Sequence, residues 1–283
     1  MRPLRISAIS FLNTVPLMWD FEHEQPPQLQ AGFRVEYTVP SLCAAQLKDG
    51  SADIGIVPVI TTATIPGLVV VPDVSIASKG PVRSILLVSK VPMESVRTVA
   101  VDTSSRTSVA LTQVLFTKFF GGPRRLVPMA PELGPMLAAC DAALLIGDPA
   151  LTAKTAGYHV YDLAELWLQK TGTAFVFAVW AVRKAALEEA DPKLDLANIF
   201  QTSRDHGLRP ENLEAIATEW APKLRLSVRD IESYLRDNIY YKLDHECLEG
   251  LRLYFLYARE CGLIPQATLE MLPSPAGRQP TSR

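Results

Sequence analysis

Polar residues cluster at positions where an apolar segment, typical of a β-strand, gives way to a helical pattern. The longest cluster is Thr103–Ser108, which contains five hydroxyl-bearing residues and one arginine and follows the strand expected over 98–102. Asn13 and Ser41 follow two earlier expected strands in the same way. A helix N-terminus offers unpaired N–H groups and a partial positive charge, so hydroxyls and amides there can bind a carboxylate or a phosphate. Corners of this kind that meet in one cleft would form a site for a small anion.

The same corners have a simpler explanation, because Ser, Thr, Asp and Asn are the preferred residues at helix N-caps. Thr103–Ser108 contains more polar side chains than one cap needs, which favours a binding role there. Arg106 is either a clamp for a carboxylate or a solvated residue of the first helical turn. Asp148, after the strand expected over 141–146, is either a helix cap or an acid–base group. The candidate binding residues from these corners are Ser41, Ser105, Arg106, Thr107, Ser108, Gly147 and Asp148.

Groups for several common kinds of catalysis are missing from these corners. The sequence has no G-x-S-x-G elbow, no phosphate-binding P-loop and no G-x-G-x-x-G turn. Its four histidines lie outside the polar corners, and its four cysteines occur singly, without C-x-x-C spacing. We therefore expect neither a metal nor a cofactor, and we expect the cysteines to be buried free thiols.

The composition is that of an ordinary globular protein, with 48% hydrophobic and 20% charged residues. The net charge of −2 argues against a nucleic-acid partner, and no basic cluster suits an anionic membrane surface. The apolar stretch near the N-terminus resembles a signal peptide, but Ser7, Ser10 and Asn13 interrupt it and no small-x-small cleavage site follows. The sequence contains no stretch of about 18 or more apolar residues, the length needed to span a bilayer. We expect a cytoplasmic protein that binds a small molecule, and the sequence leaves its oligomeric state open.

The order of the expected elements predicts two α/β lobes. Strands over 4–9, 33–39 and 53–57 alternate with helical patterns, which is typical of a mostly parallel sheet covered on both faces. A second α/β unit begins near residue 98, and an almost wholly apolar strand over 175–182 precedes a series of C-terminal helices. The simplest topology sends the chain into a second lobe and back, which leaves a hinge and a central cleft between the lobes.

We predict that lobe 1 comprises residues 1–90 and 175–272, including the C-terminal helices, and that lobe 2 comprises residues 91–174. The Pro-, Ser- and Arg-rich tail over 273–283 is expected to be loose. The alternative architecture is a single large doubly wound sheet.

Taken together, the corners and the segments around them resemble the chorismate dehydratases of the futalosine route to menaquinone. The resemblance extends from residue 4 to about residue 265, and it depends on the order and spacing of several segments rather than on one motif. Phe11 departs from the family pattern, in which Tyr is common at that position. The matching segments are Ile9–Leu17, Pro40–Leu47, Asp53–Ile60, Ser84–Ser89, Val101–Ser108, Leu144–Leu151 and Thr171–Trp180.

The resemblance implies a periplasmic-binding-protein-like (type II) α/β fold and a carbon–oxygen lyase. The implied reaction removes water from chorismate to give 3-[(1-carboxyvinyl)oxy]benzoate without a cofactor, with the enolpyruvyl carboxylate of the substrate as the proposed base. By resemblance, Asn13 and Ser84 are the catalytic residues. Asn13 would hold the substrate, and Ser84 would bond the enolpyruvyl group or the departing oxygen. Ser41 and the Ser105–Ser108 corner would bind the carboxylates, and Thr173 would close the cleft.

Two other functions remain open at this stage. A sister enzyme class shares the fold and makes 1,4-dihydroxy-6-naphthoate, but it carries a histidine suited to base chemistry. This sequence has no histidine at a comparable corner. A non-catalytic solute-binding protein for a small carboxylate would need export, and we expect no signal peptide here.

Overall fold

The computed structural model describes residues 2–23, 27–102, 104–192, 194–266 and 268–273. Two features considered in the sequence, Thr103 and nearly all of the tail expected over 273–283, lie outside these residues.

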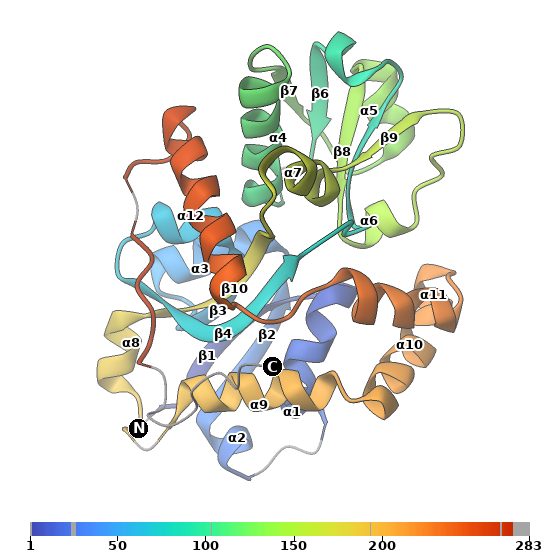
Figure 1. Ribbon diagram of the computed structural model, residues 1–283. Coiled ribbons are helices and arrows are strands. Elements are labelled where there is room, and N and C mark those ends of the chain that lie inside the picture. The colour runs from blue at the N-terminus through green and yellow to red at the C-terminus, as the bar shows by residue number, and fades with distance from the viewer. Residues whose placement is uncertain (1, 24–26, 103, 193, 267, 274–283) are drawn as a thin grey trace.

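The chain forms two lobes, each built around a five-stranded sheet (Figure 1). The strand order is β2-β1-β3-β10-β4 in the first sheet and β7-β6-β8-β5-β9 in the second. The first sheet contains β1 (Leu4–Ile9), β2 (Phe33–Thr38), β3 (Ile54–Pro58), β4 (Leu68–Ser78) and β10 (Phe175–Arg183). The second contains β5 (Ile85–Ser89), β6 (Thr98–Val101), β7 (Arg125–Pro128), β8 (Ala142–Ile146) and β9 (His159–Asp162). Two sheets replace the single doubly wound sheet that was the alternative.

Helices cover both sheets and form most of the chain after β10. The second lobe contains α4 (Arg106–Phe119), α5 (Leu133–Ala139), α6 (Asp148–Leu151), α7 (Leu163–Thr171) and the short 3₁₀ helix η3 (Met93–Ser95). The helices before the second lobe are η1 (Leu12–Met18), α1 (Trp19–Glu22), α2 (Pro27–Gly32), α3 (Pro40–Asp49) and η2 (Val59–Ala63). The C-terminal helices are α8 (Lys184–Glu189), α9 (Leu196–Gly207), α10 (Pro210–Leu224), α11 (Val228–Ser233), the π-helical turn η4 (Tyr234–Asn238) and α12 (His245–Glu260).

The boundary between the lobes differs from the one predicted at residue 90. Strand β5 pairs antiparallel with β8 and β9, so it belongs to the second sheet and the chain crosses between the lobes within residues 79–84. Lys79–Pro81, whose Gly and Pro are typical of a tight turn, form the first part of this crossover. The return crossing falls at residues 172–174, between α7 and β10, next to the predicted position.

The position of β10 in the first sheet explains why residues 175–182 are almost wholly apolar. This strand lies between β3 and β4 and is antiparallel to both, and all of its residues except the last are buried. A strand that is covered on both faces has no solvent-facing side, so its residues are apolar throughout rather than alternating.

Helix α9 supports the short helix η1, which carries Asn13. The Ser203 hydroxyl donates a hydrogen bond of 3.0 Å to the carbonyl of Leu17 and accepts one of 3.0 Å from the N–H of Asp20. A Cβ on Gly207 would overlap the carbonyl oxygen of Pro16. The two backbones therefore lie in direct contact, and this contact fixes where η1 stands.

We expect Gly207→Ala to destabilise the protein by about 3 kcal/mol, since overpacking costs about 1–3 kcal/mol and the obstacle here is rigid backbone. Urea denaturation measures the loss. Gly134→Ala in α5 is the matched control, because a Cβ there meets no atom within 4 Å and Ala favours a helix over Gly. Equal stability of the two variants would contradict the proposed backbone contact.

Helix α12 links the two lobes from one side (Figure 1). The Tyr254 hydroxyl of α12 donates a hydrogen bond of 3.2 Å to the carbonyl of Thr107 in α4, and Lys118 of α4 forms an ion pair with Glu260. Helix α4 of the second lobe is therefore braced by a helix that follows the first sheet in sequence.

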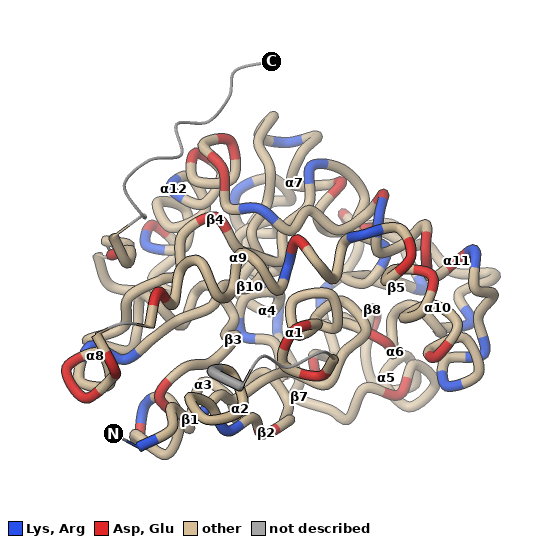
Figure 2. Tube along the Cα trace, turned by 90° about the horizontal axis from the view of Figure 1, so that it is seen from below, with Lys and Arg blue, Asp and Glu red and all other residues tan. Residues whose placement is uncertain are grey.

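Lys and Arg are interspersed with Asp and Glu along the chain (Figure 2), whose net charge is −2. Within the residues that the structure describes, no helix is long and apolar enough to cross a membrane.

Candidate functional site

A small cavity of about 50 Å³ lies between the lobes. Most of its wall is apolar, and the polar side chains on it come from both lobes. Asn13 belongs to η1, while Ser105 and Ser108 belong to the start of α4. The cavity is lined by Ile9, Phe11, Asn13, Thr14, Pro40, Pro58, Ile76, Ile85, Ser105, Ser108, Ile146, Gly147, Phe177 and Ala178. An apolar pocket with a few polar groups at defined points is typical of a small-molecule site.

The first wall of the cavity depends on the turn between β1 and η1. The Thr14 hydroxyl donates to the carbonyl oxygens of Ile9 and Phe11, so it is used to hold the turn together. The N–H of Thr14 also donates to the Phe11 carbonyl at 3.0 Å. This tight turn leaves the half-buried side chain of Asn13 on the cavity wall.

The opposite wall is the N-terminus of α4. Ser105 is the N-cap, and its Oγ accepts from the Ser108 N–H at 3.4 Å and lies 3.0 Å from the Ser108 Oγ. The preceding turn is held by Asp102, whose carboxylate accepts from the N–H and the hydroxyl of Ser104 at 2.9 and 2.7 Å. The start of a 14-residue helix, carrying two hydroxyls, therefore faces the cavity and suits an anion.

Beside the cavity, residues next to η1 in the first lobe contact residues next to α6 in the second lobe. Gly147 has a φ of 59°, and a Cβ there would lie 2.9 Å from the ring of Phe11. The next residue, Asp148, accepts a hydrogen bond of 3.1 Å from the Leu12 N–H through its Oδ1. This bond joins α6 of one lobe to η1 of the other.

Burial raises the pKa of Asp148 to about 6, and the hydrogen bond from the Leu12 N–H offsets part of that rise. Asp148 is the first residue of α6 rather than its cap, which is Gly147. The carboxyl group therefore sits at the junction of the lobes in an environment that penalises its charge.

Ser84 stands directly behind the cavity wall. It is fully buried at the end of the crossover, its carbonyl accepts from the Gly147 N–H at 2.8 Å, and the next residue, Ile85, lines the cavity. Within the described part of the chain, the Ser84 Oγ has no hydrogen-bond partner. A buried hydroxyl without a partner is uncommon and calls for an explanation.

Tyr234 of η4 lies near Ser84 and Asn13 and is not among the residues predicted from the sequence. Burial raises the pKa of Tyr234, the Ser84 hydroxyl and the Asn13 side chain lower it in part, and the charge of Asp148 raises it further. These contacts fall short of full hydrogen-bond geometry, since the Tyr234 hydroxyl has no partner among the described residues. No local motif marks such a tyrosine, because its position follows from how η4 packs.

Four other candidate residues lie off this cavity. Ser41 and the exposed Arg106 line a separate groove of about 650 Å³. The Thr107 hydroxyl accepts from the Ile60 N–H at 3.3 Å, and the Thr173 hydroxyl accepts from the Trp167 indole N–H at 3.0 Å. Their part in substrate binding stays a prediction, whereas Asn13, Ser105, Ser108 and Gly147 share the cavity wall.

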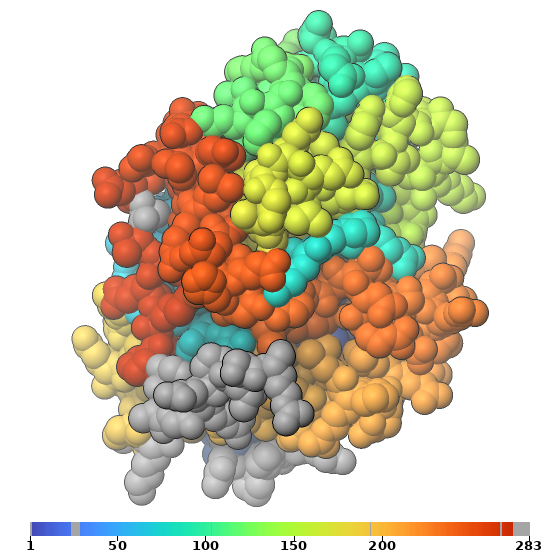
Figure 3. Space-filling view, viewed as in Figure 1, coloured from blue at the N-terminus to red at the C-terminus, as the bar shows by residue number. Residues whose placement is uncertain are grey.

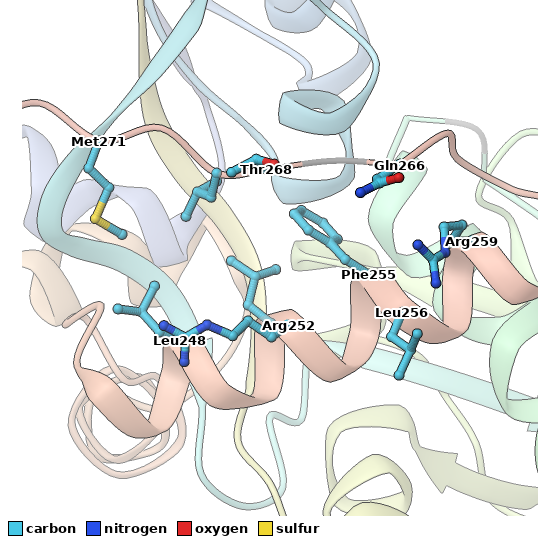
Figure 4. A pocket seen from close by; sticks show the side chains of 10 residues that line it. Leu248, Arg252, Phe255, Leu256, Arg259, Gln266, Thr268 and Met271 are labelled. Atoms are coloured by element: carbon cyan, nitrogen blue, oxygen red, sulfur yellow. The ribbon is translucent and has the colours of Figure 1, made fainter.

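Another groove, of about 530 Å³, runs between α12 and the segment that follows it (Figure 4). It shares no lining residue with the cavity between the lobes. Its lining is mainly apolar, with Arg252 and Arg259 on the α12 side.

The sequence matches a family model described as menaquinone biosynthesis over residues 4–260. The chain belongs to this family. A chorismate dehydratase from Thermus thermophilus is 31% identical over 273 residues, which cover 90% of this chain and 94% of that relative. These two matches confirm the resemblance seen in the sequence.

Solved structures confirm the periplasmic-binding-protein-like fold. Protein AF1704 from Archaeoglobus fulgidus superposes with a TM-score of 0.68 at 13% identity, covering 93% of this chain and 99% of that one. The periplasmic aliphatic sulphonate-binding protein from Escherichia coli gives a TM-score of 0.62 at 17% identity, covering 100% of this chain and 98% of that one. At these identities the likeness concerns the fold alone.

We expect Asp148→Asn to change how stability depends on pH. The folded-state pKa of Asp148, about 6, lies above that of a solvated aspartate, so the wild-type protein loses stability as pH rises through this range. Asparagine keeps the oxygen that accepts from Leu12 and carries no charge. The variant should nearly equal the wild type near pH 4 and exceed it by about 3 kcal/mol near pH 7.5. Thermal unfolding across this range checks the result, and a difference that does not vary with pH would contradict it.

Proposed function

We propose that this chain is a chorismate dehydratase, a carbon–oxygen lyase that removes water from chorismate to give 3-[(1-carboxyvinyl)oxy]benzoate. The observation that carries the proposal is the cavity between the lobes, with Asn13 on one wall and the hydroxyl-bearing start of α4 on the other. The relative that is a chorismate dehydratase supports the same reaction.

The lining of the cavity suits the substrate. Chorismate has two carboxylates on an apolar cyclohexadiene frame. The hydroxyls of Ser105 and Ser108 and the helix N-terminus offer neutral donors for a carboxylate, while Phe11, Ile76 and Phe177 offer apolar surface for the ring. Among the described lining residues there is no Lys, Arg or His, so dipoles and hydroxyls would bind the negative charge.

The chemistry needs orientation and charge stabilisation more than a strong acid or base. The hydrogen on the ring carbon that bears the ether is acidic, because the ring carboxylate is conjugated to it through the diene. Its removal by the enolpyruvyl carboxylate of the substrate sends the electrons into the ring, the bond from the neighbouring carbon to the hydroxyl oxygen breaks, and the ring becomes aromatic. The departing hydroxide takes up one proton and leaves as water. Asn13 would hold the substrate in the reactive geometry, and Ser84 would hydrogen-bond the departing oxygen.

The cavity is smaller than this substrate requires. Pockets for drug-sized ligands measure about 300 Å³ or more, whereas the cavity here measures about 50 Å³. We therefore propose that chorismate binds with the lobes farther apart than in this structure. Opening at the two crossovers, residues 79–84 and 172–174, would break the hydrogen bond between Leu12 and Asp148.

The proposal gives no role to four candidates that are engaged elsewhere. Ser41 and Arg106 line a separate groove, and the hydroxyls of Thr107 and Thr173 accept hydrogen bonds from Ile60 and Trp167. It places the protein in the cytoplasm, because its substrate is a biosynthetic intermediate.

We expect purified protein to convert chorismate to an aromatic product that is lighter by one water, with no added metal or cofactor and no inhibition by EDTA. Loss of the diene absorbance follows the reaction, and the mass of the product identifies it. Unchanged chorismate would overturn the proposal. Tight binding without turnover would point to a solute-binding protein instead.

We expect Asn13→Ala to lower kcat/KM by about 100-fold or more, the loss seen when a group that stabilises only the transition state is removed. Thermal stability should stay near the wild-type value, because the hydrogen bonds that hold this turn come from Thr14 and not from Asn13. Asn198→Ala, at an exposed position of α9, is the matched control and should keep full activity. A drop in activity that is matched by unfolding would instead make Asn13 a structural residue.

A further inference from the structure

The buried hydroxyl of Tyr234 is not used by the reaction as described so far. Tyr234 is 1% exposed and Ser84 is 0% exposed, and neither hydroxyl has a hydrogen-bond partner within the described part of the chain. Tyr234 nevertheless lies close enough to the side chains of Ser84 and Asn13 for both to affect its ionisation. It therefore lies near both residues that the family resemblance implies to be catalytic.

The crossover and η4 are held together by hydrogen bonds on both sides of this tyrosine. The Arg83 guanidinium donates to the Ser233 hydroxyl at 3.3 Å and to the Asn238 side-chain oxygen at 3.4 Å. The Asn238 amide donates to the Pro81 carbonyl at 2.9 Å. Residues next to Tyr234 in sequence are therefore hydrogen-bonded to residues next to Ser84. Figure 3 shows the crossover beside the orange segment that contains η4.

The backbone next to Ser84 is also constrained. Arg83 has a φ of 63°, in the left-handed region that an arginine rarely adopts. Its N–H donates to the Asp162 carboxylate at 2.6 Å, and the same carboxylate caps α7. A strained residue that is fixed from both lobes places the following serine in one position.

We propose that Tyr234 is a positioning residue for the dehydration. In the complex with substrate, its hydroxyl would accept a hydrogen bond from the Asn13 amide and donate one to the Ser84 Oγ, bonds that neither hydroxyl makes in this structure. This inference rests on the proposed function. A serine hydroxyl has a single proton and two lone pairs. When Tyr234 occupies one lone pair, the Ser84 proton is directed away from Tyr234 and toward the oxygen that leaves the substrate.

The reaction stays balanced without a proton from either hydroxyl. The proton removed from the ring carbon passes to the enolpyruvyl carboxylate and then to the departing hydroxide, which leaves as water. Ser84 and Tyr234 keep their protons and stabilise the charge that develops on the oxygen. Burial raises the pKa of Tyr234, so its hydroxyl remains a donor at neutral pH.

Tyr234→Phe removes this one oxygen and keeps the ring. We expect kcat to fall about tenfold or more, KM to change less than about threefold, and the melting temperature to stay at or above the wild-type value, because a hydroxyl without a partner adds little stability. Tyr241→Phe is the matched control. Tyr241 is 3% exposed and its hydroxyl also lacks a partner among the described residues, so the same atom is lost from a similar setting, with wild-type kcat expected.

The double variant Ser84→Ala/Tyr234→Phe separates positioning from a structural role. If Tyr234 acts through Ser84, the double variant has the kcat of Ser84→Ala alone, because the two losses are not independent. The inference would be overturned if the fold-losses in kcat of the two single variants multiplied in the double variant. A wild-type kcat in Tyr234→Phe, or failure of Tyr234→Phe to fold, would also overturn it. Failure of the wild-type protein to convert chorismate would overturn the proposed function instead, so the two failures are distinguishable.

Discussion

The contact between Phe11 and Gly147 is the constraint on which the site depends. Gly147 adopts a φ of 59°, and the Phe11 ring occupies the space that a Cβ would need. Glycine is the one residue that meets both demands without strain. The approach brings η1 against the second lobe, so that Asn13 and the start of α4 share one cavity. The hydrogen bond from the Leu12 N–H to Asp148 joins the lobes at the same place. Because the Asp148 carboxyl group is largely buried there, its ionisation destabilises this contact between the lobes.

The proposed anion site has no basic side chain among its described lining residues. Ser105 and Ser108 lie three residues apart and therefore share one face of α4, which is turned to the cavity. Arg106 and Thr107 lie between them and point elsewhere: Arg106 is exposed on a separate groove, and Thr107 is buried against η2. A polar cluster in the sequence thus contributes two side chains to the cavity, and helix geometry decides which two.

The sequence predicted most strands and helices because apolar periodicity is a local signal. It did not predict the partner of β5, since pairing depends on the whole sheet, and the boundary between the lobes was placed too late as a result. The place of Asn13 on the cavity wall was predictable from the polar residues that follow β1. Tyr234 was not, because it reaches Ser84 and Asn13 through a π-helical turn about 150 residues further along the chain than Ser84. Residues brought in from distant segments carry no mark in their local sequence.

The central claim is that the cavity between the lobes binds the substrate. A crystal structure of the protein with 3-[(1-carboxyvinyl)oxy]benzoate tests it most directly. The account predicts density for the ligand between Asn13 and the start of α4, with a carboxylate on the hydroxyls of Ser105 and Ser108 and the ring against Phe177. Ligand bound instead in the groove lined by Ser41 and Arg106, with the cavity between the lobes closed and empty, would contradict it.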